Sequence, residues 1–234
     1  DKVTLMLDTS GDGLHKRGYR KNANAAPLKE TIAAAMVMMS HWKYEYPLAD
    51  PLCGSGTIPI EAAMIKRNIA PGLTRSFAGE NFARIGKELW HNAREEASSR
   101  IKNVPLDIYA ADIDEKTIAV ACENARIAGV GDAVKPIVGN VAEFLHNGAY
   151  GTVICNPPYG ERLGDKEESE EIYRLMGRQF KKLDNWSYYV ITSNENFEKA
   201  FGMAAAKKRK IYNGMLKCNI YQYFGPKPPF KMEP

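Results

Sequence analysis

Residues 46–67 read Y-P-L-A-D-P-L-C-G-S-G-T-I-P-I-E-A-A-M-I-K-R, and this stretch decides the fold. Its first part, 46–50, is a short apolar strand, and 58–67 is rich in good helix formers. The two are joined by Gly-Ser-Gly at 54–56. A glycine loop between a strand and a helix exposes backbone N–H groups and the positive helix end at the carboxyl edge of a sheet. The stretch therefore predicts an α/β protein with a ligand site at this edge.

Such a loop is typical of proteins that bind nucleotides, dinucleotides or methyl donors, although a tight turn without a ligand has the same pattern. Ile58 and Pro59 stand where a dinucleotide-binding loop needs its third glycine, and no Gly-Lys-Ser/Thr follows as in an ATP-binding P-loop. The sequence thus disfavours NAD and ATP. The residues here that we expect to contact the ligand are Asp50, Cys53, Gly54, Ser55 and Gly56.

Strands and helices continue to alternate along the rest of the chain, which predicts a mostly parallel sheet with helices on both faces. A charged helix at 81–102, within the segment 71–105, is expected as an insertion. Helices are further expected at 28–42, 115–128, 168–183 and 195–203. Strands are expected at 107–112, 134–138, 152–155 and 187–192, with two terminal strands around 210 and at 217–224.

The chain is long enough for one substantial core, and we expect a single domain over 1–234. Within it, 1–45 is expected to contain a strand beginning V-T-L-M-L-D, a basic loop and a helix, and 46–234 the core. The chain starts at Asp1, and the apparent entry in the middle of a strand suggests a fragment of a longer protein.

Polar residues follow the second and third strands of the predicted core. Asp112, at the end of 107–112, can accept hydrogen bonds from both hydroxyls of a ribose, with Ile113 beside it. Asp114 is better placed to cap the following helix. Asn140 and Val141 follow the third strand, where the amide of Asn140 can bind an adenine edge or, equally well, cap a helix.

The fourth strand leads into Asn156-Pro157-Pro158-Tyr159, and these residue types suit a defined chemical task. An amine conjugated to a base ring is a poor nucleophile because its lone pair is delocalised. The Asn156 amide oxygen and the Pro157 carbonyl can accept hydrogen bonds from that amine, two prolines stiffen the backbone, and the Tyr159 ring can stack on an extruded base. A proline-rich turn without catalytic function is the alternative, but three candidate motifs at one sheet edge argue against it.

These motifs resemble those of Rossmann-like class I methyltransferases, specifically the RNA guanine-N2 enzymes related to the bacterial 23S ribosomal RNA family. The similarity covers L-H-K-R-G-Y-R (14–20), A-P-L-K-E (26–30), the glycine loop, A-D-I-D (111–114) and N-P-P-Y-G-E-R-L (156–163). It implies a seven-stranded sheet ending in an antiparallel hairpin, S-adenosylmethionine as cofactor and ribosomal or other structured RNA as partner. It also implies an N-terminal RNA-binding domain of the THUMP type, which we expect to be missing from this sequence.

Three other functions remain open at this stage. N-P-P-Y is shared with adenine-N6 enzymes, which act on DNA or RNA, and a catalytically idle binding module would keep the fold. Cys155, next to Asn156, would suggest pyrimidine C5 methylation if it were a nucleophile, although a cysteine that ends a buried strand is usually a packing residue.

Charge and composition add weaker expectations. The net charge is +4, which slightly favours a polyanionic partner, and Arg17, Arg20 and Arg162 flank the motifs as candidate RNA contacts. The four scattered cysteines suggest neither a metal site nor disulfides. No run of residues has the length and apolar character of a membrane span, so we expect a cytoplasmic protein.

Overall fold

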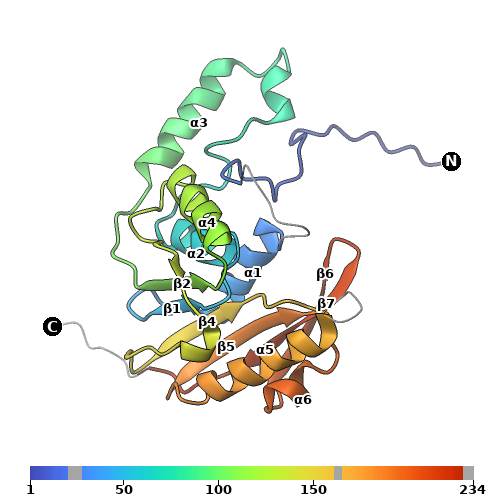
Figure 1. Cartoon of the computed structure of the whole chain (residues 1–234). Coiled ribbons are helices and arrows are strands. Elements are labelled where there is room, and N and C mark those ends of the chain that lie inside the picture. Colours follow the sequence, from blue (N-terminus) through green and yellow to red (C-terminus); the bar gives the residue numbers. More distant parts are fainter. Residues whose placement is uncertain (21–27, 161–164, 229–234) are drawn as a thin grey trace.

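The computed structural model describes residues 1–20, 28–160 and 165–228 and contains one seven-stranded sheet (Figure 1). Its strands are β1 (Leu48–Asp50), β2 (Ile108–Asp112), β3 (Ile137–Val138), β4 (Gly151–Cys155), β5 (Trp186–Thr192), β6 (Lys207–Asn213) and β7 (Leu216–Tyr223). They are arranged in the order β3-β2-β1-β4-β5-β7-β6. All neighbours are parallel except that β7 runs antiparallel to β5 and β6. The predicted α/β class and the terminal antiparallel hairpin are confirmed.

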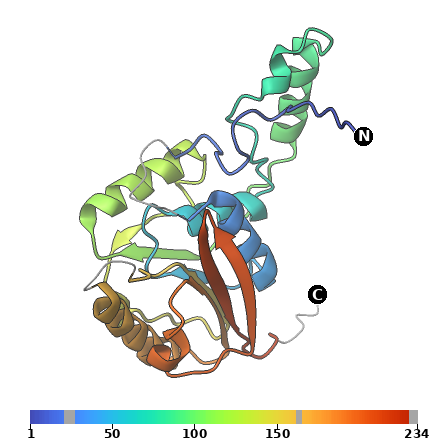
Figure 2. The ribbon, with the colours of Figure 1, turned by 90° about the vertical axis from the view of Figure 1, so that its right-hand side faces the viewer.

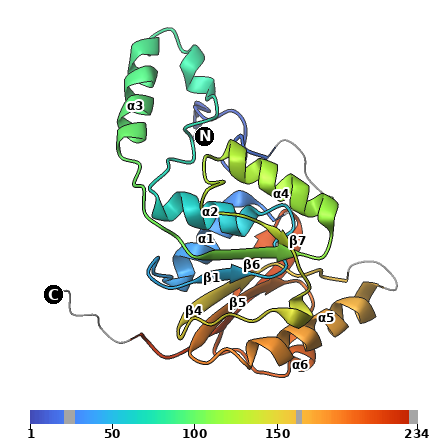
Figure 3. The ribbon, with the colours of Figure 1, turned by 60° about the vertical axis from the view of Figure 1, so that its left-hand side comes forward.

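Helices cover both faces of this sheet (Figure 1, Figure 3). They are α1 (Glu30–Ser40), α2 (Thr57–Lys66), α3 (Lys87–Ser99), α4 (Glu115–Ile127), α5 (Asp165–Phe180) and α6 (Phe197–Phe201), with the 3-10 helices η1 (Ala78–Asn81) and η2 (Val141–Glu143). Helices α1, α2 and α4 lie on one face, and α5 and α6 on the other. Met36 and Ile58 are buried between the sheet and the helices of the first face, and Tyr173 and Phe180 between the sheet and those of the second.

Helix α3 stands away from the body of the molecule, as expected for an insertion (Figure 1, Figure 2). None of its residues is buried. Trp90 stacks on Phe77 with ring centroids 5.6 Å apart, which ties the helix to the segment before it. The helix is shorter than the predicted range 81–102 because Gly86 is extended, with φ −61° and ψ 138°, so the helix begins one residue later.

Two expected strands differ from the structure. Residues 1–8 form no strand, and the apolar side chains of Val3, Leu5, Met6 and Leu7 are 83–94% exposed. A strand needs a hydrogen-bonding neighbour, and none of the described strands pairs with this segment. β3 has two residues rather than the predicted 134–138, because the Val134 N–H bonds to the Val130 carbonyl within a turn.

Among the described residues no helix combines the length and the apolar content that crossing a membrane requires.

Candidate active site

The strand order reverses between β1 and β4, and the predicted motifs meet at this point. The two strands are parallel neighbours, with Leu48 opposite Thr152 and Ala49 opposite Val153, so the loops that follow them leave the same edge of the sheet. In open α/β sheets, ligands bind outside the carboxyl ends of the strands at such a reversal. The glycine loop is also linked to the end of β2, because the Gly54 N–H donates to Asp112 Oδ2 at 3.0 Å.

The two glycines of the loop have different roles. Both have positive φ, 53° at Gly54 and 81° at Gly56, which favours glycine over other residues. A Cβ on Gly56 would lie 3.2 Å from the Cβ of Ala121 on α4, so this glycine allows close packing of helix and loop. A Cβ on Gly54 would meet nothing within 4 Å. Gly54 therefore leaves room for a ligand to approach the backbone.

Asn124 of α4 holds this loop from behind, a role that was not predicted from the sequence. Its side chain is 2% exposed, and its Nδ2 donates to the Ser55 carbonyl at 3.0 Å. Ser55 itself is buried. No local pattern marks Asn124, since a single asparagine in a helix is unremarkable until the loop is packed against it.

Asp112 and Ile113 present complementary surfaces at the end of β2. The Asp112 carboxylate accepts from the Gly54 N–H and, at 3.1 Å, from the Asp114 N–H, and it is partly exposed. A carboxylate has about four lone-pair sites, so it can still accept hydrogen bonds from a diol. Ile113 is 69% exposed and offers apolar surface next to it. Asp114 caps α4 through the Lys116 N–H, as predicted.

The third strand contributes less than expected. Asn140 Oδ1 accepts from the Ala142 N–H at 2.9 Å, so Asn140 caps η2 and the capping alternative describes this structure. The Val141 side chain is 5% exposed and packs in the core with Phe144. The Val141 side chain is therefore a packing residue of the core.

The Asn156–Tyr159 loop is held by a hydrogen bond within the motif. The Tyr159 hydroxyl donates to Asn156 Oδ1 at 2.5 Å. Pro157 is buried, whereas Pro158 is exposed. The predicted acceptor of the target amine thus already accepts one hydrogen bond in this structure, and an amide oxygen has two lone pairs.

Three titratable side chains under the loops are buried, and burial raises the pKa of each. Burial raises the pKa of Asp50 well above its usual range, and the negative charge of Asp112 adds to the effect. Burial is also the main reason why the pKa values of the Cys53 and Cys155 thiols lie well above their usual range. Only a thiolate is a good nucleophile. Neither cysteine is therefore suited to covalent catalysis.

Asp50 is 1% exposed and its Oδ1 accepts from the Leu52 N–H, so its side chain supports the loop from beneath rather than contacting a ligand. Because its pKa is higher in the folded than in the unfolded protein, stability falls as pH rises from about 4 toward the folded pKa. Asp50→Asn removes this loss. We expect its free energy of unfolding at pH 7.5 to exceed that of the wild type, because the amide carries no charge that burial can destabilise.

Denaturant titrations at pH 4.5 and 7.5 measure this difference, which should shrink at the lower pH. Asp114→Ala is the control of opposite sign, since hydrogen bonds from Thr117 and Lys116 lower the pKa of Asp114, and its loss should destabilise the protein more at pH 7.5. Equal effects of Asp50→Asn at both pH values would contradict a raised pKa of Asp50 in the folded protein.

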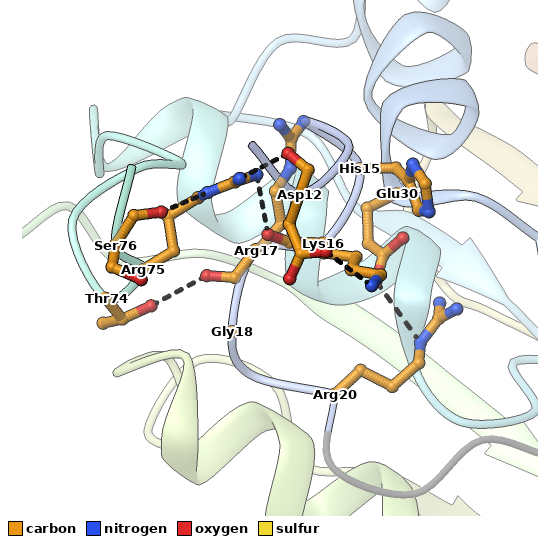
Figure 4. Close-up of a pocket in the computed structure, with 10 residues that line it drawn as sticks. All are labelled: Asp12, His15, Lys16, Arg17, Gly18, Arg20, Glu30, Thr74, Arg75 and Ser76. Carbon is orange, nitrogen blue, oxygen red and sulfur yellow. Dashed lines mark hydrogen bonds and ion pairs between the residues drawn. The ribbon is translucent and has the colours of Figure 1, made fainter. Parts of the chain in front are cut away.

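A pocket of about 520 Å³ lies between the basic loop, Glu30 of α1 and the start of the insertion (Figure 4). The residues lining it are Asp12, His15, Lys16, Arg17, Gly18, Arg20, Glu30, Thr74, Arg75 and Ser76. Arg75 donates to the carbonyls of Asp12, Gly13 and Lys16, and the Thr74 hydroxyl to that of Arg17. The insertion therefore shapes the basic loop by binding its backbone.

The two predicted arginines of this loop are paired within the protein. Arg17 donates through Nε and Nη2 to the two carboxylate oxygens of Glu61, each at 3.3 Å. Arg20 donates to the Leu28 carbonyl and the Thr57 hydroxyl, and its Nε lies 3.5 Å from Glu30 Oε1. This last contact is an ion pair without hydrogen-bond geometry. Both side chains are only 11% exposed.

Glu30 and Glu61 are therefore structural partners of the basic loop, a role that the sequence pattern did not indicate. Burial raises the pKa of Glu61, and Arg17 offsets part of the shift. Lys16 is the exposed cation of the pocket wall, with 60% of its side chain accessible beside Asp12. Arg162 lies outside the described residues.

The reversed strand β7 and a site at the reversal between β1 and β4 define the fold of a class I methyltransferase. The model of the UPF0020 family, described as an RMKL-like methyltransferase domain, matches residues 17–222. The chain belongs to this family.

Three relatives are similar over nearly the whole chain. YpsC of Bacillus subtilis, named as a candidate RNA methyltransferase, is 50% identical, and the alignment covers 96% of this chain and 58% of YpsC. Ribosomal RNA large subunit methyltransferase K/L of a Shewanella species is 41% identical, with 94% and 32% covered. The crystal structure of SMU.472, a candidate methyltransferase in complex with SAH, is 43% identical with a TM-score of 0.89, and 95% and 58% are covered. The chain thus spans between one third and three fifths of these proteins.

Proposed function

We propose that this chain transfers a methyl group from S-adenosylmethionine to an exocyclic amine of a base in RNA, and that the amine is N2 of guanine in ribosomal or other structured RNA. The observation that carries the proposal is the place of Asn156: it directly follows β4, whose parallel neighbour β1 leads into the open glycine loop. The names of the RNA methyltransferase relatives support RNA as the substrate.

The residues present fit the methyl donor. Gly54 leaves space above the loop backbone, Asp112 has lone pairs for the ribose hydroxyls, and Ile113 offers apolar surface to the adenine. SMU.472 was crystallised with the demethylated donor, SAH, which supports the same ligand here. When bound, S-adenosylmethionine supplies an electrophilic methyl group on a sulfonium.

On this proposal, the Asn156–Tyr159 loop prepares the nitrogen of the target amine. Asn156 Oδ1 and the Pro157 carbonyl accept its two N–H groups, which localises the lone pair and aims it at the donor side of the site. Tyr159 releases Asn156 Oδ1 and stacks on the base with its ring. No strong base is required, because the methylated amine loses its proton easily. Orientation supplies most of the rate gain in such reactions.

Nucleoside analysis tests the proposal. The protein is incubated with labelled S-adenosylmethionine and total RNA, and the digested RNA is separated into nucleosides. N2-methylguanosine is the expected product. N6-methyladenine, in RNA or DNA, would retain the amine mechanism and move the specificity to adenine. A 5-methylpyrimidine lost in Cys155→Ser would overturn the mechanism, as would the absence of any labelled product, which is the behaviour of an idle binding module.

We further propose that the pocket of Figure 4 takes a phosphate of the RNA backbone, with Arg17 and Arg20 in its wall. The double variant Arg17→Gln/Arg20→Gln should lower the slope of log affinity against log salt by about one unit for every phosphate that is no longer neutralised. Glutamine keeps a donor for Glu61 and Glu30, so less stability is lost than with alanine. RNA binding titrations at several salt concentrations measure the slope.

Lys181→Gln/Lys182→Gln is the matched control. It removes the same two positive charges just after α5. This helix runs from the loop after β4 back toward the start of β5, so the two lysines lie near the amino ends of the strands. Its slope should equal that of the wild type. If both double variants change the slope equally, only net charge matters; if neither does, the arginines serve the loop alone.

A further inference from the structure

A buried chain of hydroxyl groups ends on the Asn156–Tyr159 loop. Tyr173 of α5 is completely buried, and its hydroxyl lies 2.6 Å from the Pro158 carbonyl oxygen and 3.0 Å from Thr192 Oγ1. Thr192 is the last residue of β5 and is also fully buried. Its Oγ1 accepts from the Asn194 N–H at 3.1 Å. These contacts connect the loop after β4 with the end of the neighbouring strand.

The direction of each hydrogen bond that links Asn194, Thr192, Tyr173 and Pro158 follows from which groups can donate. The Pro158 carbonyl can only accept, so the Tyr173 hydroxyl donates its single proton there. The Thr192 hydroxyl must then be the donor to the Tyr173 oxygen, and the Asn194 N–H donates to Thr192. Hydrogen bonds that run in one direction polarise and strengthen one another, especially at low dielectric. The Pro158 carbonyl is therefore held by the end of a cooperative chain.

This carbonyl belongs to the peptide that leads into Tyr159. Because the peptide unit is planar, fixing the direction of the Pro158 oxygen also fixes the Tyr159 N–H and the position from which the Tyr159 side chain starts. The Tyr159 hydroxyl reaches back to Asn156 Oδ1. Pro158 is exposed to solvent, so its own side chain does little to hold this peptide in place.

We propose that Tyr173 is a positioning residue for methyl transfer, which holds the Pro158–Tyr159 peptide so that Tyr159 and Asn156 meet the target base in register. The inference rests on the proposed function. Tyr173 touches neither the base nor the donor and acts only through the Pro158 carbonyl. Burial raises the pKa of Tyr173, so its hydroxyl keeps the proton that it donates at neutral and mildly alkaline pH.

Tyr173→Phe removes the donor and keeps the ring, and Tyr188→Phe is its matched control. Tyr188 is also a buried tyrosine of the same core, whose hydroxyl shares its one proton between the carbonyl oxygens of Phe180, at 2.7 Å, and Leu183, at 3.1 Å. Both variants lose a buried hydrogen bond to the backbone, so we expect similar small decreases in Tm. Only Tyr173→Phe should lower kcat, by about 10-fold or more, with KM for S-adenosylmethionine and Kd for SAH within twofold of wild type.

Thr192→Val tests the contribution of the Thr192 hydroxyl separately from that of the Tyr173 hydroxyl. It keeps the bond from Tyr173 to Pro158 but removes the donor behind it, so kcat should fall by less than in Tyr173→Phe. A kcat for Tyr173→Phe within twofold of wild type would overturn the proposal, as would equal losses of kcat in Tyr173→Phe and Tyr188→Phe, which indicate a general effect of stability.

Hydrogen exchange provides a readout that does not depend on activity. Tyr173→Phe should accelerate exchange of the Tyr159 and Gly160 amides, whereas Tyr188→Phe should leave them at the wild-type rate. If the wild type methylates no RNA while this difference is found, the proposed function fails and the positioning of the loop stands. Unchanged exchange in Tyr173→Phe would remove the positioning role whatever the activity.

Discussion

Asn156→Ala is expected to lower kcat by about 100- to 1000-fold, the scale seen when one preorganised polar group is removed from an active site. The loss arises because Asn156 Oδ1 is the side-chain acceptor that the loop offers to the target amine. Affinity for S-adenosylmethionine should stay within about twofold, since the contacts with the methyl donor that we propose lie in the loop after β1 and at the end of β2. Single-turnover rates and calorimetry with SAH measure the two quantities separately.

Asn156→Asp distinguishes hydrogen bonding from shape. A carboxylate still accepts from an amine, so this variant should retain more activity than Asn156→Ala, although its charge alters the site. Tyr159→Phe is a second comparison, because it keeps the ring and frees Asn156 Oδ1 from its 2.5 Å hydrogen bond. Robust turnover by Asn156→Ala would refute the proposed role of the amide, and a large loss of SAH affinity would show that the residue acts on the donor.

Asp112→Ala is expected to weaken SAH binding by about 10- to 100-fold. Hydrogen bonds to a charged group contribute about 1.5–3 kcal/mol, which corresponds to this range. The variant also leaves the Gly54 N–H without its carboxylate partner, so the glycine loop loses support at the same time. Calorimetric titration with SAH measures the change.

Asp114→Ala is the matched control for this experiment, since it removes a carboxylate two residues away. Asp114 caps α4 through the Lys116 N–H and the Thr117 hydroxyl, and loss of such a cap costs about 1 kcal/mol of stability. Its SAH affinity should match the wild type. Equal weakening in both variants would mean that the end of β2 acts through stability and not through a contact with the ribose.

Much of the fold follows from local pattern. The strand, glycine loop and helix at 46–67 were predictable because apolar periodicity and small residues depend only on near neighbours in the chain. The helix over 28–42 was predicted two residues too long at each end, α1 being Glu30–Ser40. The strand expected at 3–8 failed because its apolar alternation carries no information about a pairing partner.

The site, too, was predictable only in part. Topology alone places Gly54, Asp112 and Asn156 at one edge, since parallel strands end their loops on the same side of the sheet. The expected roles of Arg17 and Arg20 as RNA contacts did not anticipate their carboxylate partners. A loop with many positive charges looks the same in sequence whether it is solvated or paired.

The sequence by itself determined most of the segments that become strands and helices and the glycine loop between β1 and α2, because those properties are set by residue type and spacing over a few positions. Only the tertiary structure decided which distant groups meet. Gly54 binds Asp112 across 58 positions, Arg17 binds Glu61 across 44, and Tyr173 reaches the Pro158 carbonyl across 15. Buried polar groups must find hydrogen-bonding partners, and which partner is within reach depends on how helices pack on the sheet, which no local pattern encodes.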